Sequence, residues 1–264
     1  MINRDIKVVI LCGGRGTRLQ EETAYRPKPM VEIGGKPILW HIMKIYSHYG
    51  FNEFILCLGY KSEMIKDYFF HYEVMNNDFT IELGSSNIIK FHNNHTEKGW
   101  KVTLADTGLA VMTGARLKRI EQYITGEELM LTYGDGVADI DINKLLGFHH
   151  KCGKIGTVTG VRPPSRFGEL ITEGETVTKF SEKPLVSQGY INGGFFVFNR
   201  RFFDYLTVED KCILEREPLE RLAEDGELMM YPHHGYWQCM DTYRDLELLQ
   251  KTWRMERAPW KVWE

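Results

Sequence analysis

A buried strand that runs straight into a glycine-rich turn is the feature of this sequence that most constrains its fold. Residues 8–12 are all apolar, and such an unbroken run is typical of a strand in a parallel sheet that is covered on both faces. Residues 13–16 read Gly-Gly-Arg-Gly. Glycines let a backbone approach phosphate oxygens closely, because no Cβ intervenes, and consecutive N–H groups there form an anion-binding nest. The sequence therefore predicts a phosphate site at the end of the first strand.

Three cationic side chains lie close behind this strand. Arg15 and Arg18 belong to the turn, and Lys28 follows ten residues after Arg18, between two prolines. Cations placed there would offset the charge on a phosphoryl group under attack. The turn lacks the third glycine of a dinucleotide-binding motif, and a proline after the Gly35-Lys36 pair excludes a P-loop. The pattern favours a loop that binds a triphosphate.

Strands and helices alternate along most of the chain. Residues 8–12 and 54–58 are expected strands, each followed by a helix, over residues 37–50 and over 63–70 with Ser62 as its cap. This order favours an α/β fold with a doubly wound, mostly parallel sheet. Residues 74–104 are more polar, which predicts a small antiparallel patch or an irregular excursion. Further strands are expected at residues 129–133, 155–161 and 194–199, and further helices at 115–123, 215–226 and 242–254.

Composition limits the compartment and the partners. The 33 basic and 36 acidic residues leave a net charge of −3, so no global field attracts nucleic acid or a membrane surface. No segment reaches the roughly 18 apolar residues of a membrane span, and no signal peptide is recognised. Five scattered cysteines without a C-x-x-C pair predict reduced thiols. We therefore expect a cytoplasmic protein with small-molecule partners, and neither nucleic acid nor membrane among them.

Two carboxylates are candidates for a metal site. Asp135 lies between two glycines at the end of an expected strand, where open α/β sheets bind their ligands. Its carboxylate suits Mg²⁺, which prefers carboxylate and phosphate oxygens. An aspartate that hydrogen-bonds its own backbone in a turn would explain this sequence equally well. Asp241 is a second candidate ligand or an ordinary N-cap of the last helix. Sequence spacing alone does not bring the two together.

A third cluster has the chemistry of a sugar phosphate site. Lys183, followed by a proline, can neutralise a phosphate, and Glu182 and Asn192 can hydrogen-bond sugar hydroxyls. A turn and a strand entrance would also explain these residues. Gly168 belongs to a segment that is equally compatible with a plain hairpin corner.

Taken in order, these motifs resemble the sugar-phosphate nucleotidyltransferases, which make nucleotide sugars from a sugar 1-phosphate. The similarity is closer to one branch, the glucose-1-phosphate cytidylyltransferases, and is carried by residues 29–46, 192–197, 235–245 and 258–264. The resemblance covers nearly the whole chain. It implies a Rossmann-like nucleotidyltransferase domain over residues 1–241, with 242–264 as the C-terminal helix and aromatic tail of the same domain. It also implies Mg²⁺-dependent transfer of a cytidylyl group from CTP to glucose 1-phosphate, and a homo-oligomer.

The resemblance assigns roles to individual residues. Arg18, Lys28 and Asp135 would be catalytic, and Asp135 and Asp241 would bind Mg²⁺. The implied nucleotide-binding residues are Leu11, Gly13, Gly14, Arg15, Gly16, Thr17, Arg18, Lys28, Gly108, Val111, Arg116 and Gly134. The implied sugar-phosphate residues are Gly168, Glu182, Lys183, Asn192 and Gly193.

One segment departs from the branch. Leu109, Ala110 and Val111 are apolar where polar side chains are usual, and Ala115 replaces a glycine. A lost hydroxyl contact costs on the order of 1 kcal/mol, so the departure predicts relaxed nucleotide choice or a different phosphorylated acceptor. Transfer from dTTP or UTP therefore stays an alternative. A catalytically silent regulatory subunit is a more distant one, because Arg18, Lys28, Asp135 and Lys183 are all retained.

Aromatic residues crowd the end of the chain, within residues 253–263. Two interpretations are open for them: a contact between subunits, or packing back onto the chain's own core.

Overall fold

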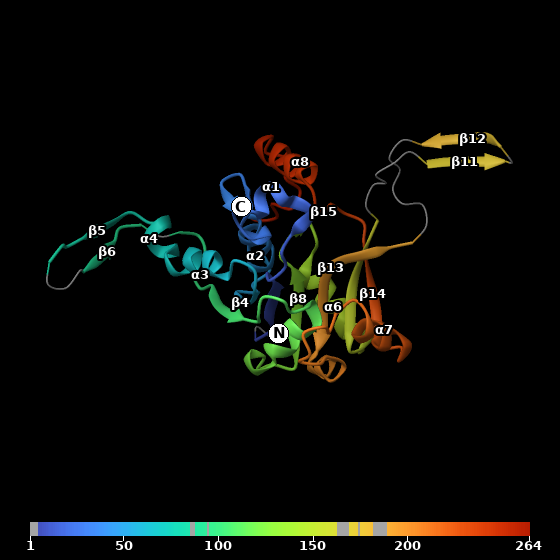
Figure 1. Ribbon diagram of the computed structural model, residues 1–264, viewed down its shortest axis with the longest axis horizontal. Coiled ribbons are helices and arrows are strands. Elements are labelled where there is room, and N and C mark those ends of the chain that lie inside the picture. Colours follow the sequence, from blue (N-terminus) through green and yellow to red (C-terminus); the bar gives the residue numbers. More distant parts are fainter. Residues whose placement is uncertain (1–4, 85–87, 94, 163–168, 174, 182–188) are drawn as a thin grey trace.

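A seven-stranded sheet forms the centre of the computed structural model, which describes residues 5–84, 88–93, 95–162, 169–173, 175–181 and 189–264 (Figure 1). The strands lie in the order β14-β10-β13-β8-β1-β4-β7. Their bounds are β1 Lys7–Leu11, β4 Glu53–Leu58, β7 Lys101–Asp106, β8 Glu128–Tyr133, β10 Gly156–Val161, β13 Ile191–Asn199 and β14 Leu228–His233. Neighbouring strands are parallel except at β13, which is antiparallel to both β8 and β10. The predicted mostly parallel α/β sheet is confirmed.

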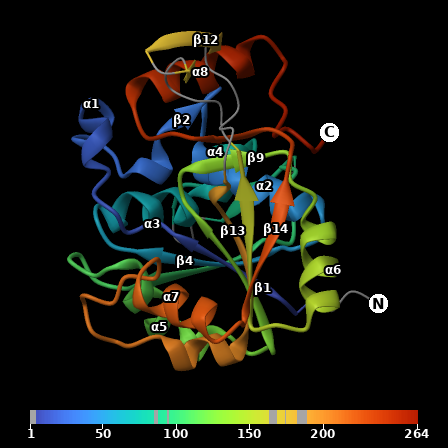
Figure 2. The ribbon, with the colours of Figure 1, turned by 90° about the vertical axis from the view of Figure 1, so that its right-hand side faces the viewer.

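Helices cover both faces of this sheet. Along β1, Val8 and Ile10 contact one apolar core, while Val9 and Leu11 contact the other, as the period of two in a strand requires. The first core receives side chains from α2 (Ile38–His48), α6 (Ile142–Cys152) and α8 (Tyr243–Arg254). The second receives them from α5 (Thr113–Arg119), η4 (Arg200–Tyr205) and α7 (Glu217–Glu224). Figure 2 shows α5 and α7 together, away from α2 and α8. The sheet is doubly wound, as predicted.

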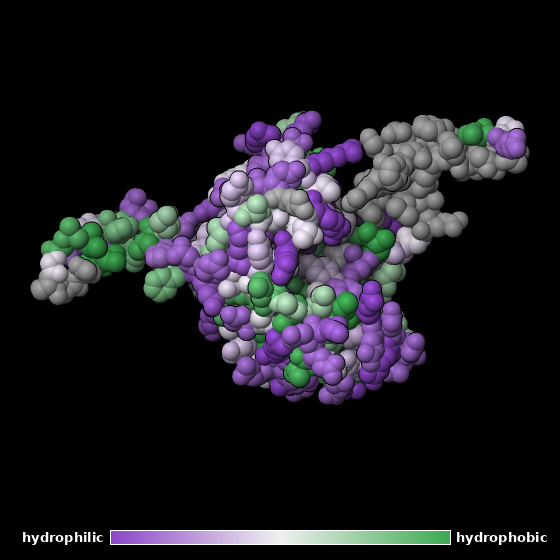
Figure 3. All heavy atoms as spheres, in the orientation of Figure 1, coloured by the Kyte–Doolittle hydropathy of each residue, from purple (hydrophilic) through white to green (hydrophobic). Residues whose placement is uncertain are grey.

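The polar segment at residues 74–104 is partly an arm and partly sheet. α3 (Ser62–Phe70) and α4 (Tyr72–Asn76) lead into the antiparallel pair of β5 (Phe79–Ile81) and β6 (Ile89–Phe91), which projects from the body (Figure 1). Apolar side chains gather on this arm (Figure 3). The prediction of an antiparallel patch is confirmed. The inclusion of residues 101–104 in it is wrong, because β7 pairs in parallel with β4 at the sheet edge.

Several local elements were predicted wrongly or not at all. Ser62 is the first residue of α3 rather than its cap; the N-cap position is Lys61, in a left-handed conformation with φ of 50°. Helix α6, whose N-cap Asp141 accepts from the Lys144 N–H, was not predicted, nor was β14. The remaining helices are η1 Thr17–Leu19, α1 Gln20–Thr23, η2 Lys28–Met30 and η3 Glu121–Tyr123. The remaining strands form antiparallel pairs: β2 Glu32–Ile33 with β3 Lys36–Pro37, β9 Gly136–Ala138 with β15 Trp237–Cys239, and β11 Glu169–Glu173 with β12 Thr176–Ser181.

No helix in the described part of the chain has the length and apolar character needed to cross a bilayer.

The aromatic tail folds back onto the chain's own core. Trp260 is fully buried, and Trp253 and Trp263 pack against the same cluster. The Trp260 indole N–H donates to Nδ1 of His41 at 3.4 Å, and Nε2 of His41 lies 2.9 Å from the Ile33 carbonyl oxygen. Only a neutral ring protonated at Nε2 satisfies both partners, since an indole nitrogen can only donate. Burial lowers the pKa of His41 to about 4.

This buried neutral histidine predicts that stability falls as the pH drops. The unfolded chain takes up a proton at His41 near pH 6.5, whereas the folded chain does so only near pH 4. Stability is therefore lost progressively between these values, by about 2 kcal/mol from pH 7 to pH 5 for this group. Urea unfolding at pH 7 and pH 5 measures the loss, with His41→Gln as the comparison. Burial also lowers the pKa of His149, but that contribution is common to both proteins. An equal loss in the variant would contradict the assignment to His41.

Candidate active site

A cavity of about 500 Å³ opens where β1 and β8 end. It gathers segments that are far apart in sequence, and most of the predicted site residues line it. These are Leu11, Gly13, Gly14, Gly16, Arg18, Lys28, Val111, Arg116, Gly134, Asp135, Asn192, Gly193 and Asp241. Arg15, Thr17 and Gly108 do not line the cavity. Gly168, Glu182 and Lys183 lie outside the described residues.

Steric contact and backbone conformation each account for one glycine of the glycine-rich turn. A Cβ on Gly13 would lie 2.1 Å from a guanidinium nitrogen of Arg116, whereas one on Gly14 would meet open space. Gly16 has a φ of +62°, which favours glycine. Gly14 and Arg15 make no hydrogen bond with the described part of the chain, so their N–H groups are available to a ligand. The anion-binding capacity predicted for this turn therefore includes the N–H groups of Gly14 and Arg15.

Arg116 joins the turn to two neighbouring strand ends. Its buried guanidinium donates to the carbonyl oxygens of Gly13 (3.1 Å), Leu58 (2.9 Å) and Gly108 (2.8 Å). Further bonds reach the Thr107 hydroxyl and the Leu109 carbonyl. All these acceptors are neutral, so the cation is held without a carboxylate partner among the described residues. Arg116 thus fixes the floor of the cavity where β1, β4 and β7 end.

Lys28 lies between the two candidate carboxylates. Its Nζ is 2.7 Å from Oδ2 of Asp135 and 2.6 Å from Oδ1 of Asp241. The Arg18 guanidinium contacts the other oxygen of Asp241 at 2.9 Å. The Met240 N–H donates to the Asp135 carbonyl oxygen at 2.8 Å, which brings the two acidic segments together. Two predicted cations and two predicted carboxylates therefore meet at one point.

Neither carboxylate has the purely structural role that the sequence left open for it. Asp135 bonds Lys28 rather than its own backbone. The N-cap of α8 is Thr242, which forms a capping box with Asp245, so the interpretation of Asp241 as that cap is wrong. Because Thr242 caps the helix, the Asp241 carboxylate remains available to the cavity.

The charges of this group stabilise one another. Burial alone would lower the pKa of Lys28, but Asp135 and Asp241 outweigh it and the net pKa is raised. Burial acts to raise the pKa of Asp241, and the contacts with Lys28 and Arg18 reverse this and lower it. Burial raises the pKa of the neighbouring Cys239 to about 12, so its thiol is protonated at neutral pH. The charged side chains that line the cavity are Lys28, Arg18, Arg116, Asp135 and Asp241, and none of these is a covalent nucleophile held beside a general base.

Part of the cavity wall consists of residues that were not predicted from the sequence. Tyr133, Thr113 and Trp237 line it, and the Trp237 indole N–H donates to the Gly193 carbonyl oxygen at 2.7 Å. Tyr133 directly precedes the Gly134-Asp135 pair at the end of a strand, and this position is the signal that could have identified it.

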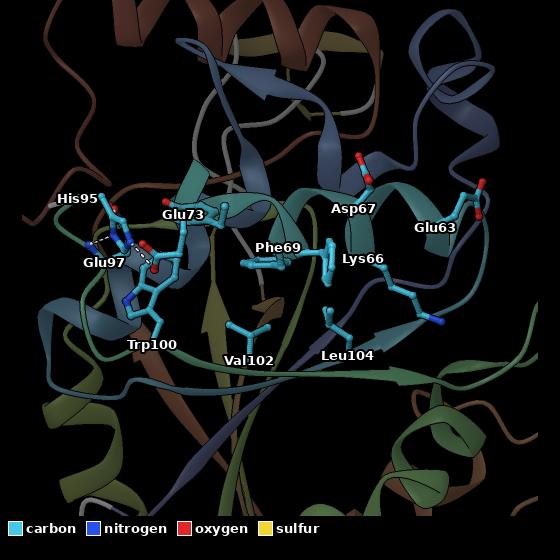
Figure 4. Close-up of a pocket in the computed structure, with 12 residues that line it drawn as sticks. Glu63, Lys66, Asp67, Phe69, Glu73, His95, Glu97, Trp100, Val102 and Leu104 are labelled. Carbon is cyan, nitrogen blue, oxygen red and sulfur yellow. Dashed lines mark hydrogen bonds and ion pairs between the residues drawn. The ribbon is translucent and has the colours of Figure 1, made fainter. Parts of the chain in front are cut away.

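A second cavity, of about 760 Å³, lies between edge strand β7 and helices α3 and α4. Figure 4 shows Phe69, Val102 and Leu104 converging at its centre, with His95 between two glutamates at one end. None of the predicted site residues lines it. The chemistry predicted from the sequence therefore belongs to the smaller cavity.

Sequence comparisons agree with the geometry. The family model for nucleotidyl transferases matches residues 7–247. The glucose-1-phosphate cytidylyltransferase of Salmonella typhi is 50% identical over 260 residues, which cover 98% of this chain and 100% of that protein. The probable glucose-1-phosphate cytidylyltransferase of Bacillus subtilis (strain 168) is 47% identical over 258 residues, which cover 98% and 100%.

Structural comparison supports the fold. The crystal structure of HddC from Yersinia pseudotuberculosis superposes with a TM-score of 0.67 at 24% identity, over 94% of this chain and 99% of that one. At this identity the likeness establishes the architecture alone. Together with the full-length sequence matches, it shows that the chain belongs to the nucleotidyl transferase family, on the branch that contains the glucose-1-phosphate cytidylyltransferases.

Proposed function

We propose that this enzyme transfers a cytidylyl group from CTP to glucose 1-phosphate, giving CDP-glucose and pyrophosphate. The observation that carries the proposal is the meeting of Arg18, Lys28, Asp135 and Asp241 beneath the glycine-rich turn. The choice of substrates rests on the full-length relatives. In this reaction an oxygen of the sugar phosphate attacks the α-phosphorus of CTP, and the bond to the pyrophosphate breaks. The attacking oxygen is already ionised, so the enzyme needs no general base.

The cations would act on the nucleotide. The turn formed by residues 13–17, with Leu11 and Gly134 beside it, would hold CTP, and the N–H groups of Gly14 and Arg15 would donate to phosphate oxygens. Lys28 would neutralise charge at the α-phosphate. Arg18, whose side chain is 71% exposed, can swing to the departing pyrophosphate. Positioning and electrostatic stabilisation would then supply most of the rate.

A divalent metal ion fits the charge balance of this site. Enzymes of this family generally use one. Lys28 and Arg18 balance Asp135 and Asp241 in formal charge, so a triphosphate would bring an excess of negative charge that further cations must offset. We propose that Asp135 and Asp241 would hold Mg²⁺, which would supply positive charge and Lewis acidity beside the phosphates. Among the described residues, no group of three or more His, Cys, Asp or Glu side chains is placed to hold a metal, so the proposal rests on these two carboxylates.

The acceptor would lie against β13. Asn192 and Gly193 also line the cavity, and we propose that they bind the sugar together with Gly168 and Glu182, while Lys183 binds its phosphate. This arrangement would place the acceptor beside Lys28, as attack on the α-phosphate requires.

We also infer that the enzyme is a cytoplasmic homo-oligomer. Its single domain would comprise the nucleotidyltransferase part, residues 1–241, together with the C-terminal helix and aromatic tail, residues 242–264. The five cysteines are free, in keeping with a reducing compartment. Phe79, Ile81 and Phe91 expose apolar surface on the β5–β6 arm, which a neighbouring subunit would cover. Light scattering coupled to size-exclusion chromatography measures the assembly.

A second candidate, the same transfer with a broader nucleotide choice, is favoured by one observation. Val111 is buried, and it lies against Gly108, where an added Cβ would be 2.8 Å from its side chain. Because valine has no hydroxyl, the side chain at this position cannot hydrogen-bond a base or a phosphate. The two candidates differ only in how strictly CTP is selected.

Pyrophosphate release tests the proposal directly. Purified enzyme with Mg²⁺ and glucose 1-phosphate is compared across CTP, UTP, dTTP, ATP and GTP. We expect fast turnover with CTP, and comparable turnover with UTP or dTTP only if the apolar segment relaxes selection. Binding of CTP without turnover would favour the silent-subunit alternative.

Lys28→Ala and Asp135→Ala should each lower kcat by about 10²–10³-fold, because each removes a charge from the reacting centre. Steady-state kinetics with CTP and glucose 1-phosphate measure the effect. Lys144→Ala is a matched control, since Lys144 is exposed and does not line the cavity. A loss below tenfold in either site variant would show that its proposed role is wrong.

Val111→Thr should sharpen the preference for CTP over UTP and dTTP, since it restores a hydroxyl worth about 1 kcal/mol, or roughly fivefold in kcat/KM. Competition between nucleotides in one reaction measures the ratio. An unchanged ratio would show that Val111 does not influence nucleotide choice.

A further inference from the structure

Four polar side chains from four separate segments form one hydrogen-bonded chain beside the active-site cavity. Asn192, at the start of β13, donates through Nδ2 to the Tyr133 hydroxyl at 3.1 Å. Tyr133, at the end of β8, donates to Oε1 of Glu215 at 2.6 Å. Thr113, the first residue of α5, donates to Oε2 of Glu215 at 2.7 Å. Three of the four, Asn192, Tyr133 and Thr113, line the cavity itself.

The direction of every bond in this chain is determined by its neighbours. The Gly194 N–H donates to Oδ1 of Asn192 at 2.8 Å, which identifies that atom as the oxygen and leaves the amide nitrogen facing Tyr133. The tyrosine accepts from this amide, so its single hydrogen goes to Glu215. The Leu214 N–H donates to the Thr113 hydroxyl at 2.9 Å, whose own hydrogen then also goes to Glu215. A carboxylate can only accept, so the chain ends there.

Packing holds the tyrosine ring in this position. Gly194 has a φ of +79°, and a Cβ there would lie 2.6 Å from the Tyr133 ring, so only glycine leaves room for it. The Phe196 ring packs edge-on against the Tyr133 ring, with 6.0 Å between the ring centroids. Burial raises the pKa of Tyr133, and the negative charge of Glu215 acts in the same direction. The hydroxyl therefore stays protonated and remains a donor at neutral pH.

One side-chain N–H of Asn192 makes no hydrogen bond with the described residues. One amide hydrogen is used by Tyr133, and the oxygen accepts from Gly194. The next peptide is fixed as well, since the Trp237 indole donates to the Gly193 carbonyl oxygen. Asn192 is therefore a pre-oriented donor at the cavity wall, suited to an oxygen acceptor such as a sugar hydroxyl.

We propose that Tyr133 and Glu215 are positioning residues that orient the Asn192 amide toward a hydroxyl of the sugar phosphate. They contribute to selection of a hydroxyl-bearing acceptor without touching the reacting atoms. The identity of that acceptor rests on the proposed function. Because Thr113 adjoins the predicted nucleotide segment at residues 108–111, the same chain also ties the acceptor side of the cavity to the nucleotide side.

Tyr133→Phe removes one hydroxyl and keeps the ring. We expect the KM for glucose 1-phosphate to rise about tenfold, because the Asn192 amide loses its orientation, while the KM for CTP and kcat change less than twofold. In an Asn192→Ala background the same substitution should add nothing further, since the group that it orients is gone. Tyr205→Phe is the matched control: its hydroxyl also bonds a carboxylate, Asp225, at 2.7 Å, away from the cavity lining.

A second measurement needs no turnover. Selective ¹⁵N-asparagine labelling reports the side-chain amide of Asn192 in the ligand-free protein, assigned by its disappearance in Asn192→Ala. Tyr133→Phe should shift this amide signal, and Tyr205→Phe should not.

The two measurements separate the two hypotheses. Wild-type enzyme that fails to turn over glucose 1-phosphate with any nucleotide would refute the proposed function, while the Asn192 signal would still decide the positioning role. An unmoved Asn192 signal in Tyr133→Phe, or an equal rise of both KM values, would overturn the positioning role even if the enzyme is fully active.

Discussion

The contact of one ammonium with two carboxylates is the interaction on which the candidate active site depends. Lys28 reaches Asp135 and Asp241 at 2.7 and 2.6 Å, and neither carboxylate would be in place without the rest of the fold. Asp135 follows a central strand, and the Met240–Asp135 backbone bond sets Asp241 beside it. The capping box at Thr242 frees Asp241 from the helix terminus. A half-buried ion pair is stable only when its charges are compensated. The strand before Asp135, the Met240–Asp135 bond and the capping box are therefore all needed to place both carboxylates beside Lys28.

The same site explains why the turn after β1 is rich in glycine. Gly13 is required by the guanidinium of Arg116, Gly16 by its backbone conformation, and only Gly14 faces open space. Arg116 binds neutral carbonyl groups that follow or end three strands, and so joins these strand ends into one surface. Preorganisation of this kind lowers the cost of ordering a binding site when substrate arrives.

Much of the architecture could be predicted from local pattern. The apolar runs in β1, β4 and β8 and the periodicity of α2 identified the buried sheet and its winding, because burial on both faces imposes that pattern directly. The edge strand β7 was placed in the antiparallel patch instead of the central sheet, because only one of its residues is buried and it lacks the apolar run of the central strands. Ser62 failed as a cap because the turn before α3 uses a left-handed residue instead. The motifs identified Lys28, Asp135 and Asp241 individually. Their meeting, like the contact of Gly13 with Arg116, depends on pairings between distant segments that no local signal encodes.

Titration with Mn²⁺, followed by water-proton relaxation with and without CTP, tests the central claim most directly. We predict weak Mn²⁺ binding to the free enzyme, because the ammonium of Lys28 lies between the carboxylates, and much tighter binding once CTP is present. Lys28→Met should bind Mn²⁺ more tightly than wild type without nucleotide. Equally tight binding to the free wild-type enzyme, unaffected by CTP or by removal of the Lys28 ammonium, would contradict it.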